Sequence, residues 1–216
     1  MLQTVVSVDP LTESNCYILV ENDRCLVIDP GEHVKLLSKL KDCGWEPELI
    51  LLTHEHCDHM AGLDALRDQY PQACFAATAV CNAGIQSLRL NLSRIMEVYM
   101  YFRGKPGIHY EPFVCRPADE IIAGDAQLEW RGHLLRLVPL PGHTPGSGGI
   151  FLDEDVFFSG DYLIPDEEPL LRFPGGDAES YEKITKPFLR SLPAGIRICP
   201  GHGEPYYNYY CFIYRK

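Results

Sequence analysis

Residues 53–59, Thr53-His54-Glu55-His56-Cys57-Asp58-His59, bring together four side chains that can bind a metal. The apolar run ELILLT (48–53) leads into them and predicts a buried strand. The segment that follows, GLDALRDQY (62–70), has its leucines at helical spacing and is ended by Pro71. The heptapeptide therefore occupies a loop from a strand into a helix, where rigid scaffolds usually carry their chemistry.

The side chains of this loop offer imidazole nitrogens and a carboxylate, which suit zinc, iron or manganese. Alternate residues of an extended segment point to the same face, so His54 and His56 can bind one ion. Asp58 and His59 can then turn toward a second ion. Cys57 alternates away from its neighbours, and we expect it to pack in the interior rather than to bind metal.

The rest of the chain divides into two halves, each with strands and helices. The first half predicts a hairpin of two strands at 16–20 and 25–29 and further strands at 48–53 and 73–77. It also predicts helices at 32–41 and 62–70, with helical character again over 82–104. The second half predicts a β-meander of four strands at 127–130, 133–138, 148–152 and 155–159. A helix at 177–191 and a short strand at 196–199 follow it. Two sheets with outer helices predict an α/β fold, a four-layer αβ/βα sandwich, in one domain over residues 1–216.

Three later motifs each place one polar residue among glycines and prolines after a β-rich run. They are PLPGHTPGSG (139–148), VFFSGDYL (156–163) and RICPGHGEP (197–205), with His143, Asp161 and His202 as the polar residues. Glycine allows the backbone to come close to a site and to adopt unusual dihedral angles. As an ordered set, these three side chains are expected to join those of residues 53–59.

Together these motifs resemble the metallo-β-lactamase superfamily, through THEHCDH (53–59), PGHTPGS (141–147), SGD (159–161) and PGHG (200–203). With VIDPG (27–31) included, the likeness spans almost the whole chain. The resemblance implies the sandwich fold of that superfamily and two divalent metal ions, zinc in the first place, with iron or manganese as alternatives. It implies that one metal is held by His54, His56 and His143, the other by Asp58, His59 and His202, and that Asp161 bridges them. Asp58 and Asp161 are the residues expected to be catalytic.

The same resemblance implies a metal-dependent hydrolase in which a metal-bound hydroxide attacks a carbonyl. The runs PADEIIAGD (117–125) and FPGGD (173–177) are most similar to small hydroxyacylglutathione-hydrolase-like proteins, and they imply a thioester substrate. A mononuclear-iron persulfide dioxygenase is the first alternative, although relatives commonly read GRTD where this chain reads Pro169-Leu170-Leu171-Arg172. A lactone or β-lactam hydrolase would use the same ligands.

The composition and net charge of the chain limit the kinds of partner that it is expected to bind. A net charge of −11 and a pI near 5.1 disfavour nucleic acid, which binds through lysine and arginine, and favour a small-molecule substrate. No run approaches the roughly 20 apolar residues that cross a membrane. The first ten residues lack the basic start and apolar run of a signal peptide, so a cytoplasmic location is expected. The nine cysteines contain no C-x-x-C pair and are expected to be reduced.

Several other features have two interpretations. Asp29, at the end of the predicted strand 25–29, either orients a histidine ligand or caps a turn. The aromatic tail, 206–214, either packs on the body or forms the contact of a homodimer. Residues 87–110 form either a lid beside the metals or an ordinary amphipathic helix. The remaining histidines, His33, His109 and His133, are expected at the surface.

Overall fold

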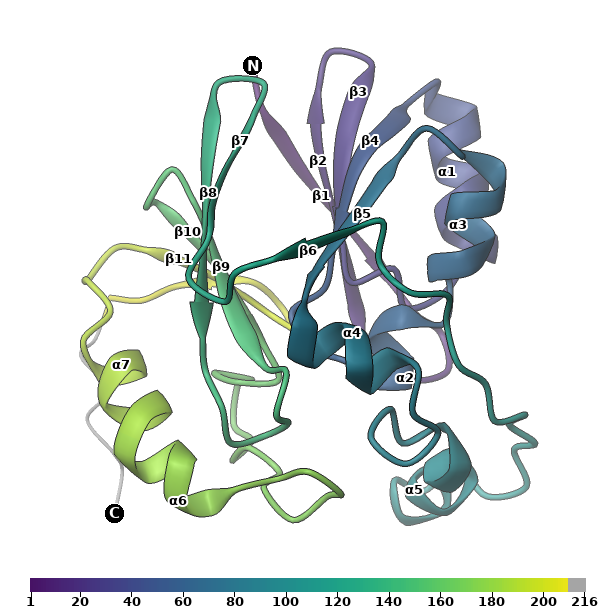
Figure 1. Cartoon of the computed structure of the whole chain (residues 1–216), viewed down its shortest axis with the longest axis vertical. Helices are drawn as coiled ribbons and strands as arrows, with labels where there is room; N and C mark the ends of the chain where they lie inside the picture. Colours follow the sequence, from purple (N-terminus) through teal and green to yellow (C-terminus); the bar gives the residue numbers. More distant parts are fainter. Residues whose placement is uncertain (210–216) are drawn as a thin grey trace.

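Two six-stranded sheets form the centre of the protein, and the computed structural model describes residues 1–209. The first sheet has the order β1-β2-β3-β4-β5-β6, with the bounds Gln3–Val8, Asn15–Glu21, Arg24–Ile28, Glu46–Leu51, Cys74–Thr78 and Glu120–Ile122. The second has the order β12-β11-β10-β9-β8-β7, with the bounds Tyr206–Tyr207, Arg197–Pro200, Val156–Gly160, Gly148–Leu152, His133–Pro139 and Gln127–Trp130. Figure 1 shows the two sheets face to face.

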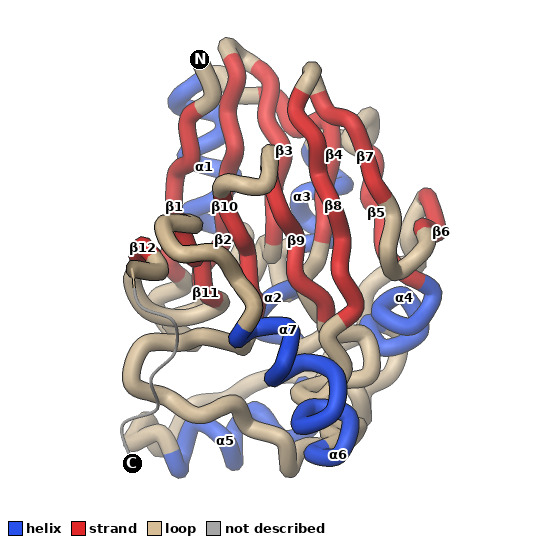
Figure 2. Tube along the Cα trace, turned by 90° about the vertical axis from the view of Figure 1, so that its left-hand side faces the viewer, coloured by secondary structure: helices blue, strands red, loops and turns tan. Residues whose placement is uncertain are grey.

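Helices lie on the outer faces of this pair of sheets. α1 (Val34–Cys43) and α3 (Leu63–Gln69) cover the first sheet, as Figure 1 shows. α6 (Ala178–Ser180) continues through a π-helical turn, Tyr181–Thr185, into α7 (Lys186–Arg190), which lies against the second sheet (Figure 2). The layer order is helix, sheet, sheet, helix, so the predicted four-layer sandwich is confirmed. None of the helices within residues 1–209 is long and apolar enough to cross a membrane.

Three separate groups of buried apolar side chains fill the three spaces between the layers. Residues of one strand alternate between faces, so Ile18 and Val20 of β2 pack toward α1 and α3 while Tyr17 and Leu19 pack toward the second sheet. The third group joins strands β9 and β10 to the final helical segment through Phe151, Phe157 and Leu189. Both faces of each sheet are therefore covered.

The loops at one end of both sheets hold the remaining helices. α2 (Cys57–Met60), α4 (Ala79–Ile85) and α5 (Met96–Phe102) lie at the lower end of the view in Figure 1. At this end β4, β8, β10 and β11 finish, and each continues directly into one of the polar motifs. The fold thus delivers four separate segments to one place.

The sequence-based elements agree with the structure except in a few places. The strands β1, β6 and β12 and the short helix α2 were not expected. The helical expectation for 82–104 holds only at its two ends, because residues 86–92 separate α4 from the 3-10 turn Ser93–Ile95 that leads into α5. Leu92 has a left-handed backbone, φ 62°, which a continuous helix cannot contain. The β-meander of β7 to β10 is confirmed.

Surface and tail predictions can also be compared with the structure. His33 and His109 are exposed, and His133 is half-buried beside Asp153. In the tail, Tyr206 pairs with β11 and its hydroxyl donates to the carbonyl of Leu163, whereas the rings of Tyr207 and Tyr209 are exposed. The rest of the predicted aromatic tail, residues 210–214, lies outside the described residues.

Candidate metal centre

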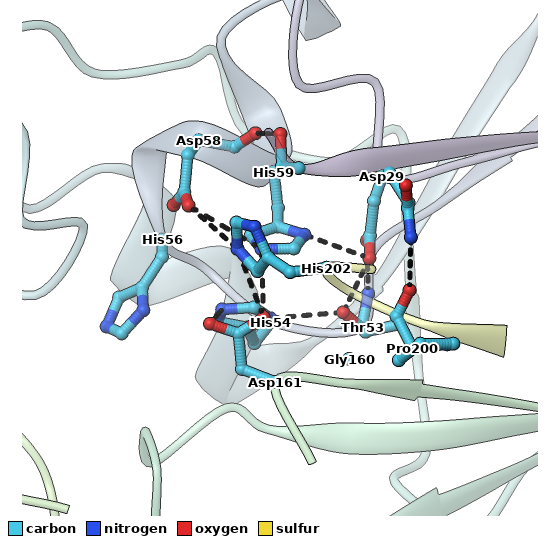
Figure 3. A network of polar contacts seen from close by, with 12 residues as sticks. Asp29, Thr53, His54, His56, Asp58, His59, Gly160, Asp161, Pro200 and His202 are labelled. Carbon is cyan, nitrogen blue, oxygen red and sulfur yellow. Dashed lines mark hydrogen bonds and ion pairs between the residues drawn. The ribbon is translucent and has the colours of Figure 1, made fainter. Parts of the chain in front are cut away.

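Four loops bring the seven predicted side chains to the same end of the sandwich. His54 and His56 follow β4, while Asp58 and His59 lie in the short helix α2. The other three each follow the end of a strand in the second sheet: His143 after β8, Asp161 after β10 and His202 after β11. Figure 3 shows His59, His202 and Asp161 facing one another, with Asp29 and Thr53 beside them.

The seven side chains form two groups of potential ligands. His54, His56, His143 and Asp161 make up the first group, and Asp58, His59 and His202 make up the second. Within each group the ligand atoms lie within 4.8 Å of one another. We call these the first and the second group.

Asp161 faces both groups, with one oxygen toward each. Its Oδ2 is 3.3 Å from Nε2 of His143 and 4.0 Å from Nε2 of His54. Its Oδ1 is 3.2 Å from Nε2 of His59 and 3.6 Å from Nε2 of His202. In the second group, Oδ2 of Asp58 lies 3.4 Å from Nε2 of His202. The carboxylate of Asp161 is therefore situated to bridge the two groups.

Several of these atoms are buried without a hydrogen-bond partner. Among the described residues they include Nε2 of His54 and His59, and Oδ1 of Asp161. His56 faces the first group through its Nδ1, which lies 3.0 Å from Nε2 of His143. A buried polar atom left unpaired costs about 1–3 kcal/mol. Inward-facing imidazole and carboxylate lone pairs form a donor set that divalent cations satisfy, so the residues fit a metal centre.

Hydrogen bonds on the outer side of two histidines of the first group determine which nitrogen faces inward. Nδ1 of His143 donates to the carbonyl of Leu170 at 2.8 Å. Nδ1 of His54 donates to the hydroxyl of Thr53 at 3.0 Å, because that hydroxyl donates to Oδ2 of Asp29 at 2.7 Å. With the proton held on Nδ1, the lone pair of Nε2 points into the site in each ring.

Asp29 connects both groups from behind. Its Oδ2 also accepts from Nδ1 of His59 at 3.2 Å, and its Oδ1 accepts from the backbone N–H of Thr53 at 2.7 Å. The carboxylate is buried, and the residue has a left-handed backbone with φ 54°. Of the two interpretations offered by the sequence, the structure supports the one in which Asp29 orients a histidine of the site.

Glu55 is a further residue of the site that the sequence analysis did not identify. It is fully buried, and it accepts hydrogen bonds from the hydroxyl of Thr144 at 2.8 Å and from the backbone N–H of Gly146 at 3.2 Å. A Cβ atom at Gly146 would lie 2.4 Å from Oε2 of Glu55, so only glycine fits there. Burial raises the pKa of Glu55. This side chain ties the loop of His54 and His56 to the loop of His143.

The backbone around His143 and His202 explains the glycines and prolines of the later motifs. The hydroxyl of Tyr162 accepts from the backbone N–H of His143 at 2.7 Å and donates to the carbonyl of Leu140 at 2.8 Å. A Cβ atom at Gly201 would lie 2.3 Å from Oδ1 of Asp161 and 2.8 Å from the ring of His59. A larger residue before His202 would push these side chains apart.

The charges of the two groups differ. Burial lowers the pKa of His54 well below its ordinary value and that of His56 to about 3, so both imidazoles are neutral. Burial would also lower the pKa of His59, but the carboxylates of Asp58 and Asp161 raise it well above its ordinary value. Burial would raise the pKa of Asp58, yet the neighbouring His59 and His202 lower it to about 2. Protons must leave the second group before it can bind a cation.

The chain is similar in sequence and in fold to known proteins. The metallo-beta-lactamase superfamily model matches residues 9–202. The probable metallo-hydrolase YqgX of Bacillus subtilis is 31% identical over 193 residues, which is 88% of this chain and 85% of that protein. The hydroxyacylglutathione hydrolase of Enterobacter sp. is 38% identical over 204 residues, or 92% of this chain. The match spans 65% of that enzyme's length, slightly less than two thirds. Among solved structures, BLEG-1, a B3 metallo-beta-lactamase, is 26% identical with a TM-score of 0.78, and the match covers 96% of this chain and 94% of that one.

Proposed function

This chain belongs to the metallo-beta-lactamase superfamily, and on that premise we propose that it is a dinuclear metallo-hydrolase that cleaves a small acyl thioester of the hydroxyacylglutathione type. The observation that carries the proposal is the convergence of seven side chains in two groups with Asp161 facing both. The thioester is supported by the relatives named hydroxyacylglutathione hydrolase, which this chain matches over 65% of the Enterobacter enzyme's length.

In this proposal His54, His56 and His143 hold one divalent ion. Asp58, His59 and His202 hold the other, and Asp161 offers one oxygen to each. The imidazole and carboxylate donors support zinc, with iron or manganese as alternatives. Bound divalent metals lower the pKa of a coordinated water to about 7 and polarise a carbonyl, which supplies the hydrolytic chemistry at neutral pH.

The protein's own side chains hold the donors in place for this chemistry. Asp29, directly and through Thr53, holds a proton on the outer nitrogens of His59 and His54. Glu55 and Tyr162 fix the backbone of the loop that carries His143. The carboxylates of Asp58 and Asp161 balance part of the positive charge of two cations. These groups preorganise the site, so that little rearrangement accompanies the reaction.

Metal analysis paired with a substrate panel tests the proposal. Purified protein is expected to contain about two metal ions per chain and to hydrolyse small acyl thioesters, because both groups are complete. Asp58→Ala is expected to lower both the metal content and the activity, while Asp42→Ala, at an exposed position of α1, leaves both unchanged. Metal-loaded protein that is inert toward thioesters, lactones and phosphodiesters would contradict the proposal. One iron per chain with oxygen uptake on a persulfide would favour the dioxygenase instead.

Three broader expectations belong to the same proposal. A small-molecule substrate suits an acidic chain whose relatives include hydroxyacylglutathione hydrolases. The single domain over residues 1–216, the cytoplasmic location and the homodimer stay predictions from the sequence. Size-exclusion chromatography with light scattering would test the homodimer.

A further inference from the structure

A small pocket opens directly beside the two groups of ligands. Besides His56, Asp58, His143 and Asp161, it is lined by Leu92, Ile95, Met96, Tyr99, Leu170 and Phe173. The pocket is thus continuous with the proposed reaction centre. Beyond the side chains that face the metals, its walls are aliphatic and aromatic.

Two segments far apart in the sequence form these walls. One wall comes from residues 92–99 at the start of α5, and the other comes from Leu170 and Phe173. The walls meet where the ring of Phe173 contacts the ring of Tyr99, with centroids 5.8 Å apart, and the ring of His56, with centroids 6.1 Å apart. Phe173 therefore joins the far wall to the metal loop.

The wall of residues 92–99 is fixed at its base rather than hinged. Leu92 takes a left-handed backbone, which costs an L-residue other than glycine about 1–2 kcal/mol. The neighbouring Asn91 is fully buried and holds this turn, since its Oδ1 accepts from the backbone and hydroxyl of Ser93 and its Nδ2 donates to the carbonyl of Phe113. The carbonyl of Asn91 accepts from the backbone N–H of Cys57 at 2.8 Å, so the wall is attached to the metal loop itself.

The charge and size of the pocket limit what it can accept. Among the side chains that line it in the described part of the chain, none is lysine or arginine. Burial raises the pKa of Tyr99 to about 12, so its hydroxyl is neutral at working pH. The volume open to the centres of water molecules is about 30 Å³, room for about two waters. A chain of a few carbons fits this space, and a carboxylate at its far end, away from the metal ligands, would find no cationic side chain.

We propose that this pocket, which we name the acyl pocket, receives the acyl group of the substrate and selects a short, uncharged, apolar chain. The inference rests on the proposed metallo-hydrolase function, because the acyl carbon must lie beside the metals. It goes further in assigning the acyl group, rather than the thiol part, to the space between residues 92–99 and Leu170 with Phe173.

Binding of hydroxamates to the metal-loaded protein tests this inference without any turnover. Acetohydroxamate, propionohydroxamate and butyrohydroxamate share one metal-binding head, and succinic acid monohydroxamate replaces the last methyl of butyrohydroxamate by a carboxylate. Titration calorimetry is expected to show affinity rising about threefold with each added methylene. The succinic compound is expected to bind at least about tenfold more weakly than butyrohydroxamate, because its carboxylate loses water without gaining a partner.

A pair of variants shows whether the acyl pocket causes this preference. Leu92→Asn keeps the branched shape and the number of heavy atoms and suits the left-handed backbone, but it makes the wall polar. It is expected to weaken butyrohydroxamate about fivefold and to leave acetohydroxamate unchanged. The matched control is Val98→Asn on the exposed side of α5, which should change neither.

Three results would overturn the inference. The first is an affinity that does not depend on chain length in the wild-type protein, and the second is equal binding of the succinic compound. The third is a protein that takes up no metal and binds none of the hydroxamates, which would remove the metal centre as well. If the chain-length gradient is found but thioesters are not hydrolysed, the acyl pocket is supported and only the proposed thioester reaction fails.

Discussion

The two groups of ligands share Asp161 but differ in charge. Both groups are buried: the side chains of His54 and His143 are 1% and 3% exposed and that of His59 is 0% exposed, and His202 alone among these is more exposed, at 17%. In the first group burial lowers the pKa values of His54 and His56, so these imidazoles are neutral, whereas in the second group the pKa values of His59 and His202 are raised beside the carboxylates of Asp58 and Asp161. This contrast indicates that the first group can bind a cation without losing the protons of these rings, while the second must exchange protons for metal.

Removing Asp161 is expected to have the largest effect, because this residue faces both groups. Asp161→Ala should reduce the metal content from about two ions per chain to fewer than one and lower kcat/KM about 10³-fold, the scale of metal-ion stabilisation. Asp58→Ala should leave about one ion, held by the first group. Metal analysis by mass spectrometry distinguishes the two variants, and equal losses in both would contradict the division into groups.

Asp29 offers a way to disturb both groups from behind without removing a ligand. Asp29→Asn preserves the shape but weakens the acceptor for His59 and for the hydroxyl of Thr53. Loss of such an outer partner typically lowers metal affinity 10–100-fold, and we expect that loss at both groups. The hydroxyl of Thr53 contacts one ligand, His54, and otherwise donates to Asp29, so Thr53→Val should weaken the first group more than the second. Competition with a chromophoric chelator measures these affinities.

Only part of this network could be predicted from the sequence. The seven ligands could be named because each follows a strand, four of them stand together in one short segment and the other three stand among glycines and prolines, features that a linear sequence displays. Glu55 has no comparable feature in the linear sequence. Its partners Thr144 and Gly146 lie 89 and 91 positions away, and a glutamate between two histidines could equally be an exposed residue. The role of Tyr162 depends in the same way on a contact between loops.

The elements that were missed have similar physical causes. β6 has three residues, and its pairing with β5 crosses more than 40 positions of the sequence, so local propensity carries little information about it. Over 82–104, the side chains favour a helix locally, but the buried hydrogen bonds of Asn91 impose a turn at Leu92. Tertiary contacts override propensity in both cases.

Variants of Glu55 test how the two loops of the first group are joined, and their effect is measured as a change in protein stability. Glu55→Ala leaves the hydroxyl of Thr144 and the N–H of Gly146 without this acceptor, and we expect the free energy of unfolding to fall by about 1–3 kcal/mol. Glu55→Gln keeps one carbonyl acceptor and should lose less. Urea denaturation of the metal-free proteins gives both values. A variant as stable as the wild type would show that the two loops are joined without Glu55.

The smallest predicted difference is in the pH at which the two groups release their metal ions. It arises because their histidines take up protons at different pH values. The pKa values of His59 and His202 are raised, so these rings regain protons at a higher pH than His54 and His56, whose pKa values are lowered. A protonated imidazole cannot bind metal, so between about pH 8 and pH 5 the second group is expected to release its ion first. Metal content after dialysis at each pH should therefore show a step near one ion. Simultaneous loss of both ions would contradict the difference in charge.

Anomalous diffraction from crystals of the metal-loaded protein would locate the ions relative to the seven side chains. Two peaks are expected, one with nitrogens of His54, His56 and His143 at about 2.0–2.1 Å and the other with ligand atoms of Asp58, His59 and His202 at about 2.0–2.2 Å. Asp161 should contribute an oxygen to both. A single peak, or peaks away from these side chains at saturating metal, would show that the seven side chains do not form a dinuclear site.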